Sequence, residues 1–293
     1  MYLGPPPQQI VPDVWTELPA ELRIPHTPQR HNFLEGPSFD RDGNLYVVDI
    51  YAGRVYRISP AGKWDMVIEY DGAPNGLKIH KDGRIFLACR KYGLALLDVK
   101  RGRVETILDG PRRDQKFRSL NDLVFHSSGD VYFTEQGRTG LQDPTGRVWC
   151  LRTNGQLEMI IDTVPSPNGL VFNPAETELF VAVTRGNCIW WVDMADPERR
   201  GELFVQMHAQ GPDGMAMDSA GNVVIAHAYH GAAWIYDRDA APLFYIKSPR
   251  GKMLTNMAYG GPDNRTLYMT ESASCSILTA TLPVAGQKMF SHM

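Results

Sequence analysis

The sequence has no marked excess of charge of either sign. Its 293 residues include 30 Lys and Arg against 33 Asp and Glu, which gives a net charge of −3. The basic residues are scattered along the chain, whereas proteins that bind nucleic acids or anionic membranes concentrate positive charge. We therefore expect neither nucleic acid nor membrane as a partner.

Long apolar runs are missing as well. No stretch approaches the roughly 18 uninterrupted apolar residues that cross a bilayer. The N-terminal sequence MYLGPPPQQIVPDVW has no basic segment followed by an apolar core, which a secretory signal would show. We expect a cytoplasmic protein, and the sequence does not indicate its oligomeric state.

Cysteine is scarce, and the four cysteines form no recognisable pattern. They lie far apart in strand-like segments, without a CxxC pair, at Cys89, Cys150, Cys188 and Cys275. This spacing indicates neither a zinc knuckle nor a disulfide framework, so buried free thiols are expected. A Gly-x-Ser-x-Gly nucleophile motif and a His-x-x-x-His zinc pair are also missing.

What the sequence does contain is a repeat. A polar residue that precedes alternating apolar residues occurs six times, and in the first five repeats Gly or Asp comes directly after it. Counted from one polar residue to the next, the spacings are 40, 46, 47, 45 and 43 residues. The six residues are Glu35, Asn75, Asn121, Asn168, Asp213 and Asn256.

Each repeat continues with further β-rich runs separated by turns. In the first repeat these runs cover 44–50, 53–59 and 64–70. Four antiparallel strands at a period of 40 to 50 residues are typical of a β-propeller blade, so we predict an all-β, six-bladed propeller forming a single domain over 1–293. The sixth repeat lacks a fourth run, and we expect the segment 13–19 to supply that strand and close the ring.

The first strand of each blade lies nearest the axis, so the six polar residues are expected to converge at one end of the channel. Asn-Gly and Asp-Gly pairs are also common in turns, which is the alternative interpretation for any single position. Glu is a poor turn former, however, and two converging carboxylates repel each other without a cation. Oxygen ligands of this kind suit a hard divalent cation, so we predict a metal at Glu35, Asn168 and Asp213.

Four motifs resemble those of the family of regucalcin (senescence marker protein), gluconolactonase and the luciferin-regenerating enzyme. They are EGPSF, SLNDLVF, SPNGLVFN and GPDGMAMD, and the resemblance extends over about residues 34–271. It implies one divalent metal, with Ca²⁺ expected first and Zn²⁺, Mn²⁺ or Mg²⁺ as alternatives. The metal would be held by Glu35, Asn168 and Asp213, with Asn121 as a fourth ligand or a substrate contact.

The resemblance also implies hydrolysis of a small lactone, most often a sugar lactone. Metal polarisation of the carbonyl would be combined with attack by water, and Asp213 is the expected general base. Five further residues are candidates for substrate contact: Arg118, Glu135, Asn75, Tyr229 and His230. Many relatives have an Asp-Pro pair after Phe-Thr, where this chain has FTEQG, so the sequence leaves the identity of the substrate open.

Two other functions remain as alternatives. One is a calcium-dependent phosphotriesterase similar to diisopropyl-fluorophosphatase, which shares the fold and the channel calcium. The other is a non-catalytic calcium-binding propeller, in which the metal only stiffens the ring.

Overall fold

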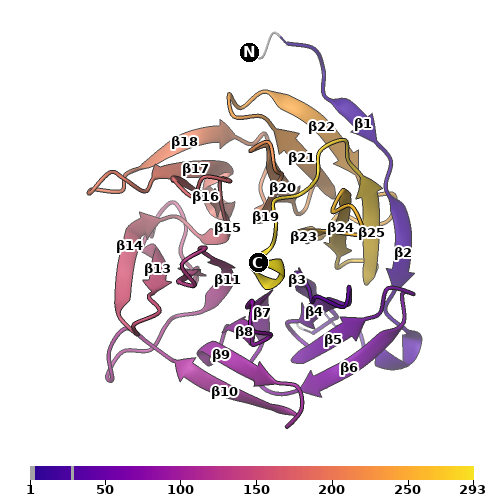
Figure 1. The fold of residues 1–293 in the computed structure, drawn as a ribbon, viewed down its shortest axis with the longest axis horizontal. Coiled ribbons are helices and arrows are strands. Elements are labelled where there is room, and N and C mark those ends of the chain that lie inside the picture. The colour runs from indigo at the N-terminus through magenta and orange to yellow at the C-terminus, as the bar shows by residue number, and fades with distance from the viewer. Residues whose placement is uncertain (1–3, 28–29) are drawn as a thin grey trace.

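A computed structural model describes residues 4–27 and 30–293. In this part of the chain, 25 strands form six sheets arranged around a central axis (Figure 1). Every sheet consists of antiparallel neighbours in chain order, with its first strand nearest the axis, apart from additions at two outer edges. The predicted six-bladed β-propeller is confirmed.

The first four blades share one plan, in which the chain runs from the inner strand outward. Blades one and two consist of β3 (Leu34–Phe39), β4 (Leu45–Asp49), β5 (Arg54–Ile58), β6 (Trp64–Glu69), β7 (Pro74–Ile79), β8 (Ile85–Cys89), β9 (Gly93–Asp98) and β10 (Arg103–Leu108). Blades three and four consist of β11 (Leu120–Phe125), β12 (Val131–Glu135), β13 (Gly146–Leu151), β14 (Leu157–Val164), β15 (Pro167–Phe172), β16 (Glu178–Val183), β17 (Cys188–Asp193) and β18 (Gly201–Gln206).

The last two blades take strands from the N-terminal segment. Blade five consists of β19 (Pro212–Met217), β20 (Val223–His227), β21 (Ala232–Tyr236) and β22 (Pro242–Lys247), and blade six begins with β23 (Leu254–Gly260), β24 (Thr266–Glu271) and β25 (Ser276–Thr281). β2 (Asp13–Glu17) pairs antiparallel with β25, which confirms the predicted ring closure. β1 (Gln8–Ile10) adds a parallel fifth strand beside β22, which was not predicted because three residues after a proline run carry no strand periodicity.

The blades adhere to one another through apolar residues on both faces of each sheet. Val148 and Cys150 of blade three, for example, share one buried cluster with Leu170 and Val181 of blade four. Successive strand residues point to opposite faces, so each blade presents apolar side chains to both neighbours. Burying one such aliphatic side chain contributes about 1.5–3 kcal/mol, and the blade interfaces therefore hold the inner strands in place.

The two ends of the channel differ in chemistry. The inner strands begin with the polar residues of the repeat and end with apolar ones. At the apolar end, the 3-10 helix η3 (Phe290–His292) lies over the axis, and the ring of Phe290 stacks on Phe125 with centroids 4.9 Å apart (Figure 1). A cavity of about 110 Å³ beneath it is lined by side chains that include Phe125, Phe172 and Met217. A ligand seeking polar groups must therefore approach from the other end.

Two further expectations from the sequence concern the cysteines and segments that could cross a membrane. All four cysteines are free thiols, three of them buried, while Cys275 is only partly buried. The helices in the described residues are short 3-10 turns, including η1 (Ala20–Leu22) and η2 (Thr184–Gly186), and none has the length and apolarity needed to cross a bilayer.

Candidate metal centre

Five of the six repeat residues occupy the same place in their blades. Each is the second residue of an inner strand, and none is more than 9% exposed: Glu35, Asn75, Asn121, Asn168 and Asp213. Carboxylates and amides are rarely so buried unless they are paired. The fold therefore collects polar groups at one end of the channel.

Asn256 does not occupy this position, and the prediction of six equivalent residues was wrong there. Leu254 begins β23 and pairs with Glu271 at the end of β24, so Thr255 stands in the second place and Asn256 in the third. Asn256 thus corresponds to Asp122 of blade three. The sequence carried a signal of this shift, since Asn256 is followed directly by Met257, whereas the other five polar residues are followed by Gly or Asp.

The third position of the inner strands is glycine in the other four blades, and packing explains why. A Cβ atom added to Gly214 would lie 2.1 Å from the side chain of Asn256, and one added to Gly76 would lie 2.8 Å from Asp122. Contacts this short are not tolerated between non-bonded atoms. Gly76 and Gly214 therefore leave room in the channel for Asp122 and Asn256, which come from opposite blades of the ring, whereas Gly36 and Gly169 lie against the backbone of the neighbouring blade.

Asn256 connects two carboxylates inside the channel. Its Nδ2 donates to Glu35 Oε2 at 2.8 Å and to Asp122 Oδ2 at 3.1 Å. Glu35 Oε2 also accepts from the backbone of Gly36 at 2.8 Å, and Glu35 Oε1 receives no donor from the described part of the chain. Asp122, only 2% exposed, is a third channel carboxylate that the sequence analysis missed.

These carboxylates have too little positive charge around them. Burial, followed by the charge of Asp122, raises the pKa of Glu35 to about 8. Burial and the charge of Glu35 raise the pKa of Asp213 well above its usual value. Desolvation and like charges both favour the neutral acid, and a cation placed among these groups would reverse the effect.

The amide of Asn168 has its orientation fixed by a neighbour. The hydroxyl of Thr184 donates to the carbonyl oxygen of Pro212 at 2.8 Å, so its oxygen is left to accept from Asn168 Nδ2 at 3.1 Å. Asn168 Oδ1 must then face the other way. It is buried and has no hydrogen-bond partner among the described residues. A buried amide oxygen beside carboxylates is a suitable ligand for a hard divalent cation.

A second chain of hydrogen bonds orients Asn121. Its Nδ2 donates to Gln136 Oε1 at 3.0 Å, and Gln136 Nε2 donates to Ser166 Oγ at 3.1 Å. Arg185 Nη1 also donates to Ser166 Oγ, at 3.1 Å. In this arrangement Nδ2 of Asn121 faces Gln136, and Asn121 Oδ1 accepts no hydrogen bond within the described part of the chain. Sequence analysis did not single out Gln136, Thr184 or Arg185 for this role.

Two predicted substrate contacts are engaged within the protein. The guanidinium of Arg118 donates to Thr145, at 2.7 Å to Oγ1 and 2.9 Å to the carbonyl oxygen. The carboxylate of Glu135 accepts from the Arg118 backbone and from Trp149 Nε1, both at 2.8 Å, and is 2% exposed. Glu271 binds backbone N–H groups at the corresponding strand end of blade six. Both carboxylate oxygens of Glu135 therefore already accept hydrogen bonds from within the protein.

The other predicted contacts lie at different depths. Asn75 is buried in the ring of second-position residues. Tyr229 is 63% exposed and lines a cleft of about 540 Å³ beside the starts of β3 and β23, whose other lining residues include Phe33, Tyr51, Met253 and Ser272. His230 lies on the same hairpin but is grouped with two other histidines, described below.

The sequence of the chain matches a known family. Residues 33–273 match the sequence profile of the SMP-30/Gluconolactonase/LRE-like region, and the chain therefore belongs to this family. The family resemblance predicted from the four motifs is confirmed.

Individual relatives agree with this assignment. The chain is 32% identical over 250 residues to pentonolactonase XacC of Haloferax volcanii, covering 80% of each protein. It resembles the structure of a gluconolactonase from Xanthomonas campestris with a TM-score of 0.76, 21% identity, and coverage of 95% of this chain and 99% of the other. A calcium-binding protein, regucalcin, from Agrobacterium tumefaciens gives a TM-score of 0.76 at 21% identity, covering 97% of each chain. At these identities the structural similarities establish the fold.

Proposed function

We propose that the protein hydrolyses a small sugar lactone with the help of one divalent cation held by Glu35, Asn168 and Asp213. The observation that carries the proposal is the buried, unpartnered Oδ1 of Asn168, fixed in the same channel as two carboxylates whose pKa values are raised. Membership of the family and the similarity to a pentonolactonase support the choice of substrate class.

The ligand set favours a hard metal. All candidate ligand atoms are oxygens, from two carboxylates and one amide, and Asn121 Oδ1 offers a fourth. Ca²⁺, Mn²⁺ and Mg²⁺ prefer such ligands, whereas Zn²⁺ is bound more often through nitrogen or sulfur. The calcium-binding regucalcin among the similar structures supports Ca²⁺ as the first choice.

In the proposed reaction, water attacks the lactone carbonyl carbon, the ring C–O bond breaks, and a hydroxy acid is released. When bound, the cation would polarise the carbonyl and stabilise negative charge on its oxygen. Asp213 accepts a proton from the attacking water and returns it to the leaving ring oxygen. A cation held by these ligands would lower the pKa of Asp213 and favour its ionised form, which is the form that accepts a proton.

The remaining channel residues orient the reactants. Asn256 and Gly36 hold one oxygen of Glu35, which directs the other toward the channel. Asn121 is positioned by Gln136 to contact a substrate hydroxyl or to act as a fourth ligand. Arg185 uses Nη1 alone for its bonds to Ser166 and to the carbonyl oxygen of Thr139, so we propose that its Nη2 and Nε, in place of Arg118, meet the substrate.

The decisive experiment measures hydrolysis by the metal-stripped protein after each metal is restored. Sugar lactones, simple lactones and an organophosphate are assayed in parallel with Ca²⁺, Mn²⁺, Mg²⁺ and Zn²⁺. We expect lactone hydrolysis that chelation abolishes. Asp213→Asn should lower kcat by at least about 10²-fold, the contribution of a general base. Asp218→Asn is the matched control, since Asp218 follows the same strand but only holds a turn.

Each other outcome points to a different function. Hydrolysis of the organophosphate alone would indicate a phosphotriesterase. Metal-dependent stability without hydrolysis of any substrate would indicate a non-catalytic propeller. Near-normal turnover by Asp213→Asn would reject Asp213 as the base.

A further inference from the structure

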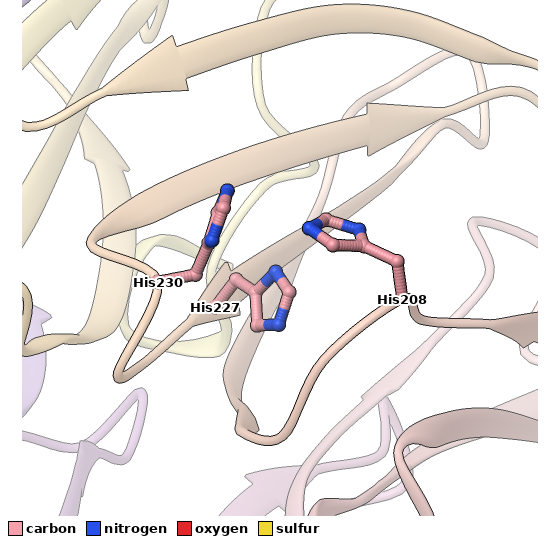
Figure 2. Close-up of side chains that lie close together, drawn as sticks. All are labelled: His208, His227 and His230. Atoms are coloured by element: carbon pink, nitrogen blue, oxygen red, sulfur yellow. The ribbon is translucent and has the colours of Figure 1, made fainter.

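Three histidines, from blade five and from the connection that leads into it, lie together beside the start of β19. His208 lies between β18 and β19, His227 ends β20, and His230 lies in the turn that leads to β21. One potential ligand atom from each lies within 4.8 Å of the other two, and Figure 2 shows the three rings gathered together. Among the described residues, no other group of three or more His, Cys, Asp or Glu side chains meets this criterion.

His227 is arranged as a metal ligand would be. Its Nε2 lies 3.1 Å from the carbonyl oxygen of Ala209, and because a carbonyl only accepts, Nε2 must carry the proton. Nδ1 then carries the lone pair, and it is buried without a hydrogen-bond partner in the described part of the chain. A histidine whose second nitrogen donates to a backbone carbonyl is typical of metal sites. Burial also lowers the pKa of His227 to about 4, which keeps the ring neutral.

The other two histidines leave the site open to solvent. His208 is exposed and His230 is partly buried, with ring centroids 4.7 Å apart. Nε2 of His230 lies 3.2 Å from the hydroxyl of Tyr245, which orients its ring. Tetrahedral coordination at about 2.0–2.1 Å requires the three nitrogens to approach one another further, and the exposed ring of His208 has the freedom to do so.

The donor set differs from that of the channel. It consists of imidazole nitrogens alone, and the neighbouring charges are positive, from Lys247 and Lys252. Ca²⁺ and Mg²⁺ need oxygen ligands, so neither suits this cluster. A borderline ion such as Zn²⁺ binds neutral imidazole well and accepts three protein nitrogens with a solvent molecule in the fourth position.

We propose that His208, His227 and His230 form a second metal site, which binds Zn²⁺ or a similar first-row ion independently of the channel. Such a site would join the segment 208–211, which leads into the strand carrying Asp213, to the hairpin between β20 and β21. Binding would therefore stabilise the folded chain, since the ligands come from segments that separate on unfolding.

The test is a calorimetric Zn²⁺ titration of the untagged, full-length protein in excess Ca²⁺. The Ca²⁺ fills the oxygen ligands of the channel and does not bind the imidazole nitrogens of the cluster. Wild type should bind one Zn²⁺ with a rise in its thermal midpoint. His208→Ala should weaken this binding at least about 100-fold, because losing even an outer-shell partner of a ligand reduces affinity by about 10–100-fold. His208 is exposed, so its substitution should leave the fold intact, which circular dichroism verifies.

His26→Ala is the matched control, since His26 is an exposed histidine outside the cluster. It should bind Zn²⁺ as wild type does. Equal Zn²⁺ binding by wild type and His208→Ala would overturn the proposal, and so would displacement of Zn²⁺ by Ca²⁺. The proposal does not depend on the lactonase assignment, because binding and thermal stability are measured without substrate.

Discussion

Asp122 and Asn256 lie 134 residues apart in the chain, yet their side chains meet across the channel, with Asn256 Nδ2 3.1 Å from Asp122 Oδ2. The same amide nitrogen donates to Glu35 at 2.8 Å. One neutral donor thus separates two buried carboxylates that would otherwise face each other directly. Changing that donor is a sensitive test of the electrostatics of the channel.

Asn256→Asp should destabilise the metal-free protein by about 3 kcal/mol, because it removes the shared donor and adds another buried acid. The free energy of unfolding in urea measures the effect. Asn44→Asp is the matched control, since Asn44 Nδ2 also donates to a carboxylate, Asp40 Oδ2 at 2.8 Å, but at a more exposed turn. The free energy of unfolding should fall by less than about 1 kcal/mol in Asn44→Asp. Equal losses at the two sites would contradict a role for channel burial.

Thr184→Val should weaken binding of the channel metal by about 10- to 100-fold, because the amide of Asn168 loses the group that fixes its orientation. Calcium titration by calorimetry measures the change. Thr184→Ser keeps the hydroxyl and should bind calcium nearly as wild type does. A valine variant with unchanged affinity would show that Asn168 is not a ligand.

The metal-free protein should lose stability as the pH rises. Its Glu35 holds a proton until pH about 8, whereas the unfolded chain releases that proton near the usual value of 4.5. The folded state therefore binds more protons between these values, and its free energy of unfolding falls as pH rises through this window.

Thermal midpoints measured in chelator between pH 5 and 8 test this dependence. Adding Ca²⁺ should flatten the slope, and Glu35→Gln should reduce it in the metal-free protein because the titrating group is gone. An unchanged slope in that variant would assign the effect to other residues.

Arg185→Ala should raise KM for sugar lactones by about tenfold while changing kcat little, which corresponds to the loss of one charged hydrogen bond. Arg118→Ala is the comparison, because Arg118 binds Thr145 through both Nη1 and Nη2, whereas Arg185 makes its internal bonds through Nη1 alone, and this substitution should change KM by less than about twofold. Steady-state kinetics on a lactone substrate separate the two. A larger effect at Arg118 would restore the assignment made from sequence.

The fold could be predicted because its signals are local. Turn residues and alternating apolar residues recur in every blade, so the strands and their order follow from short windows of sequence. The missing fourth run of the last repeat also identified the segment that became β2. β1 carries no comparable signal, since three residues show no period and their pairing with β22 depends on tertiary structure.

The site was only partly predictable, because it depends on neighbours that are distant in sequence. Glu35, Asn168 and Asp213 were found because they recur at the blade spacing. Asp122 was missed because it occupies a position that is glycine in four other blades and therefore departs from the repeat. The contribution of Thr184 requires knowing that its hydroxyl is already donated to Pro212. The histidine cluster joins His208 to a hairpin of the next blade, and no short motif records that contact.

The pairing of β2 with β25 has a consequence for synthesis on the ribosome. β2 emerges before the first blade is made, but its partner is complete only once residue 281 has left the exit tunnel. Until then the sixth blade is incomplete, and the edge of β24 that β25 covers has no partner strand. A product halted short of β25 would be an open arc prone to associating with other chains through that edge, so translational arrest late in the message should yield aggregates instead of a smaller working enzyme.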